Sequence, residues 1–225
     1  MKRITPARPR PAARRRQSGP RGAEAVSAAA AAAPDLARLR EQARGCRGCP
    51  LYRRGTQTVF GEGPDRPRLI LVGEQPGDRE DRAGRPFVGP AGGLLERALA
   101  EAGIERPSVY VTNAVKHFKW VRVGQRRIHQ KPSSREVAAC RPWLEREIEL
   151  LGPAVVVALG ATAAQSLMGP AFRVTRERGR KIAVPWARAF FATVHPSSIL
   201  RGPPERREEE FARLAADLRQ AAARA

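Results

Sequence analysis

The chain has 225 residues, of which 42 are Lys or Arg and 22 are Asp or Glu, so its formal net charge is +20. This excess favours an acidic partner, and nucleic acid ahead of membrane, because no apolar run is long enough to cross a bilayer. Three cysteines, two of them spaced C-x2-C, and a basic N-terminus without the apolar core of a secretory signal predict a reducing cytoplasm.

Residues 1–34 form a segment rich in Pro, Arg and Ala. Its eight basic residues against one acid, Glu24, predict a disordered basic tail with a charge of +7. The tail is either attracted to DNA without sequence preference or a dispensable extension. The ordered domain is predicted over 35–225, opening with Asp35 as the cap of a helix over 36–43.

Apolar stretches and helical periodicity alternate along this domain. Buried strands are predicted at 69–72, 108–112, 154–159 and 190–194, and helices at 91–102, 133–151, 161–167 and 204–223. The capping box Ser133-x-x-Glu136 opens the second of these helices, and Pro142 is expected to kink or restart it. Alternation of this kind predicts a three-layer α/β/α sandwich with a mostly parallel central sheet.

Polar segments follow three of the predicted strands, at 73–81, 113–132 and 195–201. Ligands bind beyond the carboxyl ends of parallel strands, so the three segments should converge on one site. The middle segment is predicted to be a long loop without secondary structure of its own. Because 113–135 holds seven Lys or Arg and no acid, the loop is expected either to contact a phosphate backbone or simply to be a solvated surface.

Candidate functional side chains stand in these segments. Glu74 can orient water or stabilise a developing cation, and His195 can donate a hydrogen bond to an anionic leaving group. Cys46 and Cys49 form the C-x2-C pair, and Cys140 with His117 can complete a set of three sulfurs and one nitrogen. Such a set suits either zinc or an iron–sulfur cluster.

Four segments in this order resemble motifs of the uracil-DNA glycosylase superfamily: Gly73–Gly77, Gly84–Gly89, Thr112–Lys116 and His195–Ser198. The resemblance covers roughly Leu36 to Leu218 and is nearest to the iron–sulfur family 4 enzymes. Arg126–His129 is similar to the insertion loop of the UdgX branch, whose members become covalently joined to their DNA. Gln75 and His117 also match that branch, whereas Gln125 stands where the branch typically has Lys.

The resemblance implies a role for each site residue. Catalytic roles fall to Glu74, supporting the sugar cation, to His195, bonding uracil O2, and to His129, as the nucleophile. Phe87 is expected to stack on the extruded uracil, Asn113 to read its amide edge and Glu80 to crowd C5. Water in the pocket is expected to be ordered by Gln75 and Asp78. The adjoining phosphates are expected to be held by Ser197, Ser198 and Arg201. A 4Fe–4S cluster on Cys46, Cys49, His117 and Cys140 is implied ahead of zinc.

The implied function is excision of uracil from single-stranded DNA, or of a flipped base, followed by a covalent bond between His129 and the abasic site. A conventional turnover family 4 enzyme, with His129 as a phosphate-contacting surface residue, is the first alternative. The second is a non-catalytic DNA-binding protein with a structural metal. The protein is expected to be a monomer without a membrane partner, in a bacterial cytoplasm and associated with the nucleoid.

Overall fold

The computed structural model describes residues 35–225, and the predicted tail over 1–34 lies outside the described residues. No helix in 35–225 is both long and apolar enough to cross a membrane. Four strands in this part of the chain run parallel in the central sheet: β1 (Leu69–Gly73), β2 (Val109–Asn113), β5 (Val155–Leu159) and β7 (Ala187–Thr193). The short β6 (Ile182–Val184) is antiparallel to β7 at one edge, and the order is β2-β1-β5-β7-β6.

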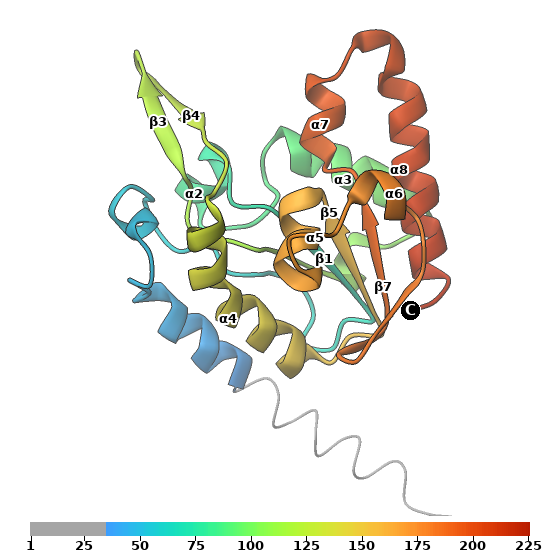
Figure 1. The fold of residues 1–225 in the computed structure, drawn as a ribbon, viewed down its shortest axis with the longest axis horizontal. Helices are drawn as coiled ribbons and strands as arrows, with labels where there is room; N and C mark the ends of the chain where they lie inside the picture. The colour runs from blue at the N-terminus through green and yellow to red at the C-terminus, as the bar shows by residue number, and fades with distance from the viewer. Residues whose placement is uncertain (1–34) are drawn as a thin grey trace, which may run out of the picture.

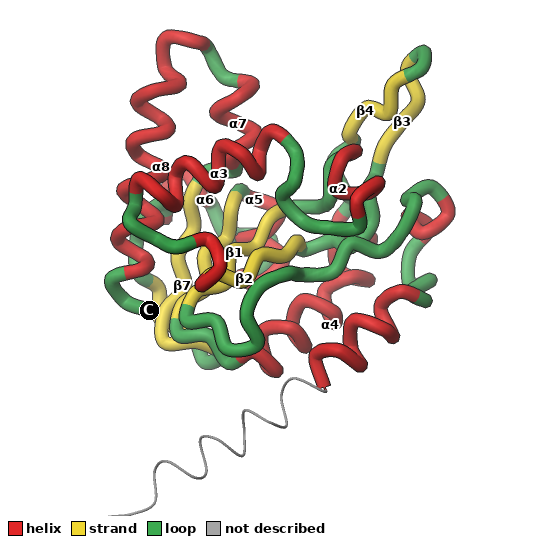
Figure 2. Tube along the Cα trace, turned by 180° about the vertical axis from the view of Figure 1, so that it is seen from behind, coloured by secondary structure: helices red, strands yellow, loops and turns green. Residues whose placement is uncertain are grey.

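Helices cover both faces of this sheet (Figures 1 and 2). Leu71, Val111 and Val157 point to one face, where they pack with apolar residues of α3 (Pro90–Glu101), α7 (Pro196–Arg201) and α8 (Arg207–Ala222). Ile70 and Val72 point to the other face, toward a helix over 35–44, α4 (Ser134–Leu151), α5 (Ala161–Met168) and α6 (Val174–Glu177). Alternation of side chains along each strand supplies both cores, which confirms the predicted α/β/α sandwich.

The capping box predicted for α4 is present. Ser133 Oγ accepts from the Glu136 backbone N–H at 3.3 Å, and the Glu136 carboxylate accepts from the Ser133 N–H at 2.6 Å. Pro142 lies inside α4 on an exposed position, and the helix runs on to Leu151. Of the two outcomes expected at Pro142, a restart does not occur, because the helix tolerates a missing N–H bond on its solvent side.

The basic segment after β2 is not a loop without structure, as the sequence suggested. It folds into a hairpin of β3 (Trp120–Val123) and β4 (Arg126–His129), which projects from the body of the molecule (Figures 1 and 2). Gly124 occupies the left-handed region at the turn, with φ 57°. The period-2 pattern of Val121 and Val123 is the strand signal, and the surrounding arginines obscured it.

Several short elements were not predicted. They are α2 (Asp78–Ala83), α6, β6 and α7, together with the 3-10 turns Pro50–Arg53, Arg106–Ser108 and Pro204–Arg206. The last of these turns delays the closing helix, which begins at Arg207 and not at 204. The site depends on α2 and α7, because α2 begins directly after the Gly73–Gly77 motif and α7 begins within the His195–Ser198 motif.

Candidate functional site

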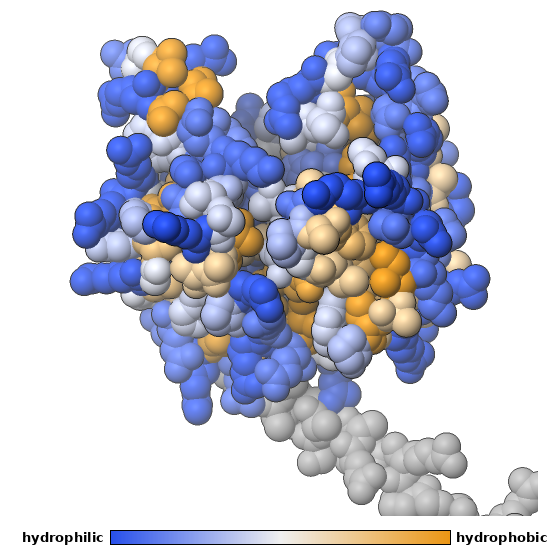
Figure 3. Space-filling view, viewed as in Figure 1, coloured by the Kyte–Doolittle hydropathy of each residue, from blue (hydrophilic) through white to orange (hydrophobic). Residues whose placement is uncertain are grey.

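The carboxyl ends of β1, β2 and β7 bring Glu74, Asn113 and His195 to one edge of the sheet. Gly73 and Asn113 are register partners, and the His195 ring stacks on Phe87 with 6.2 Å between the ring centroids and 25° between their planes. Figure 3 shows the surface hollowed between the β3–β4 hairpin and the α7–α8 side of the molecule. The predicted convergence of the strand ends is therefore present in the fold.

Gly73 makes the floor of this site possible. A Cβ on Gly73 would lie 2.4 Å from Asn113 Oδ1 and 2.7 Å from Phe87 Cζ, so any side chain would displace both. Phe87 itself has a φ of 57°, a conformation that costs energy for a residue with a side chain. Gly92 of α3 leaves room for this backbone, since a Cβ there would be 1.7 Å from Phe87 O. The ring of Phe87 is thus held beside Asn113 by two glycines.

The Glu74 carboxylate joins the sheet edge to the hairpin. Its Oε1 lies 3.2 Å from His129 Nε2, and its Oε2 accepts from Thr162 Oγ1 at 2.5 Å. Burial raises the pKa of Glu74, but the hydrogen bonds from His129 and Thr162 outweigh it, so the pKa lies below its ordinary value. Glu74 is therefore ionised at neutral pH and faces an imidazole whose side chain is 46% exposed.

His195 is held as a neutral hydrogen-bond donor. Its Nδ1 accepts from the Ser197 backbone N–H at 3.2 Å and lies 2.8 Å from Ser197 Oγ. Burial lowers the pKa of His195 to about 4, although Glu74 opposes the shift. Since Nδ1 is an acceptor, the ring hydrogen of the neutral imidazole is on Nε2, which can donate to a ligand.

Gln75 fixes the base of the hairpin. Its Nε2 donates to Lys119 O at 3.2 Å and to Gln130 O at 3.0 Å, and its Oε1 accepts from the Lys119 N–H at 3.1 Å. Lys119 and Gln130 flank the two strands, and the Gln130 N–H donates to Lys119 O at 2.9 Å. The sequence predicted that Gln75 lies in the pocket. In the structure, the Gln75 amide instead bonds to the hairpin that carries His129.

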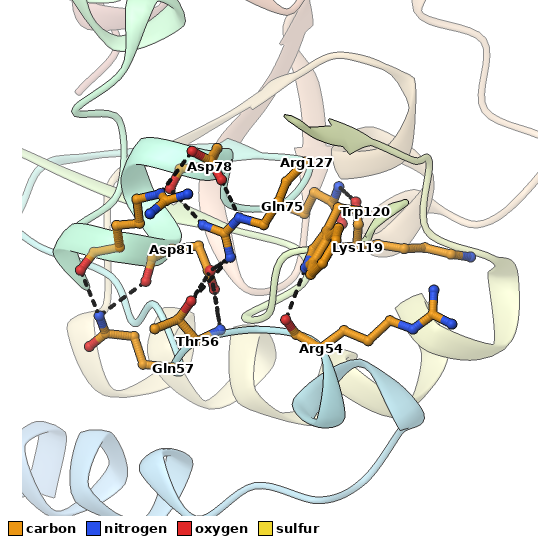
Figure 4. Close-up of polar contacts among 10 residues, drawn as sticks. Arg54, Thr56, Gln57, Gln75, Asp78, Asp81, Lys119, Trp120 and Arg127 are labelled. Carbon is orange, nitrogen blue, oxygen red and sulfur yellow. Dashed lines mark hydrogen bonds and ion pairs between the residues drawn. The ribbon is translucent and has the colours of Figure 1, made fainter. Parts of the chain in front are cut away.

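Arg127 attaches the same hairpin to α2 (Figure 4). Its guanidinium bonds Asp78, the buried Asp81 at 2.7 Å and Thr56 Oγ1 at 3.1 Å. It also lies over the rings of Phe118 and Trp120, at 5.5 Å and 5.4 Å from their centroids. The Asp78 carboxylate, expected to order water, is therefore engaged by Arg127 and also by Arg82.

The remaining predicted substrate contacts lie around this edge. Glu80 accepts from the Gly89 N–H at 2.9 Å and lies against Gly77, so it braces two loops at this edge. On α7, Ser198 Oγ donates to His195 O at 2.7 Å, and Ser198 and Arg201 are exposed. Sequence reasoning missed Thr162, Asp81 and the anchoring role of Arg127, because their partners lie far away in the chain.

The three cysteines gather beside α4. Cys140 is buried with Leu51 and Val115, and Cys49 packs against them. Burial, with smaller contributions from the neighbouring Cys46 and Cys49, raises the pKa of Cys140 to about 11, although Lys116 opposes the shift. Two sulfurs accept N–H bonds of 3.2 Å, Cys46 Sγ from Trp143 Nε1 and Cys140 Sγ from the Lys116 backbone. Within 35–225, no three His, Cys, Asp or Glu side chains lie close enough together to hold a single metal ion.

His117 follows Lys116, whose backbone N–H donates to Cys140 Sγ, and the His117 ring makes contacts of its own. Its Nε2 is 3.1 Å from Thr58 Oγ1, and the single hydroxyl hydrogen of Thr58 is donated to Ala43 O at 2.9 Å. The hydroxyl oxygen therefore accepts from His117 Nε2–H, which leaves the lone pair of the ring on Nδ1. Burial lowers the pKa of His117, and Asp81 opposes the shift, so the ring is neutral near pH 7.

Comparison with known proteins identifies the family. The model of the uracil DNA glycosylase superfamily matches residues 60–219. A type-4 uracil-DNA glycosylase of Thermotoga maritima is 42% identical over 162 residues, covering 72% of this chain and 81% of the relative. One of Sulfurisphaera tokodaii is 35% identical over 189 residues, 80% and 83% of the two lengths. A type-5 enzyme of Thermus thermophilus is 34% identical over 154 residues, 60% and 65% of the two lengths. The three strand-end motifs at one edge of the parallel sheet agree with these matches. This chain therefore belongs to the uracil-DNA glycosylase superfamily and, within it, to the type-4 enzymes.

Proposed function

We propose that this uracil-DNA glycosylase excises uracil from DNA and then becomes covalently bonded to the sugar through His129. The observation that carries the proposal is the 3.2 Å contact between His129 Nε2 and Glu74 Oε1. It places an imidazole beside the carboxylate that would face the sugar. The type-4 names of the relatives support the excision step alone.

Recognition of the base is assigned to Phe87, Asn113 and His195. The substrate is uracil in single-stranded DNA or extruded from a duplex, because the reacting bond is not reachable inside the stack. The extruded ring stacks on Phe87, and the Asn113 amide reads the edge that distinguishes uracil from cytosine. Glu80 braces the wall beside C5, and Ser197, Ser198 and Arg201 of α7 hold the adjoining phosphates. The protein acts as a monomer.

Cleavage separates charge along the bond between C1′ and the base. The bonding electron pair leaves with uracil, whose O2 then carries negative charge and accepts a hydrogen bond from His195 Nε2. The ionised Glu74 carboxylate stabilises the cation that remains on the sugar. Both groups are preorganised, because Ser197 holds the tautomer of His195 and Thr162 holds Glu74.

Capture of the cation follows. A ring nitrogen of His129 donates its lone pair to C1′, and the imidazole proton passes to Glu74. The product is a neutral N-alkylated imidazole, which is a poor leaving group, so the enzyme turns over once. In a conventional enzyme water would take this position, and His129 would contact phosphate. Attachment of the hairpin through Gln75 and Arg127 favours capture, because it keeps His129 next to Glu74.

A 4Fe–4S cluster is proposed at Cys46, Cys49 and Cys140, with His117 as the fourth ligand through Nδ1. Two observations support the fit. Cys46 and Cys49 lie close enough to Cys140 to act on its thiol, and two of the three sulfurs accept N–H bonds of the kind that stabilise thiolates. When bound, the cluster supplies a structural brace between the segment around Cys46 and α4.

The test is incubation with a uracil-containing oligonucleotide, followed by a denaturing gel. We expect a shifted band with the wild-type protein and none with His129→Ser, which should instead release uracil with turnover because water reaches C1′. Arg126→Ser, on the same strand, is the matched control and should still crosslink. A shifted band of undiminished yield with His129→Ser would show that a residue other than His129 is the nucleophile.

A further inference from the structure

Lys116 ends in a fully buried ammonium group that the reaction steps above do not use. Its side chain is 1% exposed, and that of its partner Glu147, on α4, is 0% exposed. A Lys ammonium has three N–H donors, and here each has an acceptor: Thr112 Oγ1 at 2.7 Å, Asn113 O at 2.9 Å and a Glu147 carboxylate oxygen. One of the three bonds therefore goes to the backbone of the residue assigned to reading the base.

Stability alone does not account for this arrangement. Removing two charges from water offsets most of their attraction, so a buried ion pair can often be replaced by neutral side chains without loss of stability. The Glu147 carboxylate is already well supplied with donors, since it accepts from Tyr110 OH at 2.9 Å and from the Gly61 N–H at 3.0 Å. The ammonium adds what these donors cannot, a bond to the Asn113 carbonyl.

The turn that contains Lys116 connects the base pocket to the cysteines. The Ala114 N–H donates to Gly73 O at 2.9 Å, and the Val115 N–H donates to Glu74 O at 3.0 Å. The Lys116 N–H then donates to Cys140 Sγ at 3.2 Å. Asn113 begins this turn, and its Oδ1 lies so close to Gly73 that a small shift of its backbone would move the amide.

We infer that Lys116 is a positioning residue: its ammonium fixes the Asn113 backbone, and so the amide, in the base pocket. The inference rests on the proposed function in one respect, that Asn113 reads uracil. It adds that uracil recognition depends on a cation beneath the pocket, held between β2 and α4. The positive charge of Lys116 then contributes to the recognition of uracil as well as to the packing of the core.

The test uses a variant without buried unpaired charge. Lys116→Met alone would leave the buried Glu147 carboxylate without its cation, so Lys116→Met is combined with Glu147→Gln. We expect this double variant to melt near the wild-type temperature and to bind abasic DNA normally. Free uracil should inhibit it far less, and single-turnover excision should slow about 100-fold, the effect of a displacement of about 1 Å. Tyr110→Phe, which removes another bond to Glu147 without touching Asn113, is the matched control and should keep both properties.

Asn113→Ala separates this inference from the proposed function. Because both changes act on one amide, adding the double substitution to Asn113→Ala should slow excision little further. Equal visible absorption of the purified proteins would show that the loss is not a loss of the cluster. If the folded double variant is inhibited by uracil as strongly as the wild type and excises uracil at the same rate, the inference is overturned. If Asn113→Ala itself excises normally, the assignment of Asn113 fails, and this inference fails with it.

Discussion

The Glu74 carboxylate lies between two donors from different elements, Thr162 of α5 and His129 of β4. One carboxylate oxygen accepts a hydrogen bond from the Thr162 hydroxyl, and the other lies against the His129 imidazole. Both donors keep the pKa of Glu74 below its ordinary value in spite of burial. A single carboxylate can therefore stabilise the sugar cation and also accept the proton of His129.

Glu74→Gln tests both tasks at once. The amide keeps the size of the side chain but loses the charge, so we expect uracil release and crosslinking to fall together by about 10²–10³-fold. Thr162→Val, which removes one hydrogen bond and leaves the charge, should cost much less. Single-turnover assays that follow released uracil and the covalent band provide the measurement, and unchanged rates in Glu74→Gln would remove its catalytic role.

The hairpin is the element that brings His129 to the sheet edge. Its two attachments differ in kind, because Gln75 bonds backbone groups at the base while Arg127 bonds the carboxylates of α2. The half-buried guanidinium also lies over the rings of Phe118 and Trp120. The position of β4 therefore depends on one arginine more than on the several others nearby.

Arg127→Met should release the hairpin without touching the base pocket. We expect the crosslinking rate to fall about 10²-fold, because the nucleophile is no longer held in place, while uracil release continues and free abasic product appears. Arg122, the register partner of Arg127, is exposed, and Arg122→Met makes the same change of charge as a control. Equal crosslinking by the two variants would contradict the anchoring role.

Elements with a strong local pattern were the ones that the sequence predicted. The buried strands around Leu69 and Val155 are continuous apolar runs, and the start of α4 follows from Ser133 and Glu136, so no distant contact was needed. The hairpin and α2 were missed because their patterns are short and rich in arginine and acid. The contacts of Arg127, Lys116 and Gln75 were missed for another reason, namely that each joins segments 30 or more residues apart.

At the scale of the whole molecule, His195 makes stability depend on pH. Its pKa is about 4 in the folded state, against about 6.5 for an ordinary imidazole, so between these values the unfolded chain binds more protons. The contribution is fully present above pH 6.5 and is lost as the pH falls to 4. It amounts to roughly 3–4 kcal/mol, since one pKa unit corresponds to about 1.4 kcal/mol.

His195→Gln should remove this part of the acid sensitivity. We expect the difference in unfolding free energy between pH 7 and pH 4.5 to be smaller in the variant than in the wild type. Urea titrations at the two pH values measure it, and the comparison cancels the carboxylates common to both proteins. The same difference in both proteins would mean that His195 does not titrate with a depressed pKa.

The two ends of the β3–β4 hairpin are joined by one hydrogen bond, from the Gln130 N–H to Lys119 O at 2.9 Å. A segment that leaves and re-enters the fold at neighbouring points can be inserted or deleted while the rest of the chain keeps its path. The proposed capture of DNA through His129 would then depend on a segment that can be inserted or deleted by itself. Removal of the hairpin would leave the strand-end residues Glu74, Asn113 and His195 on the sheet that carries them.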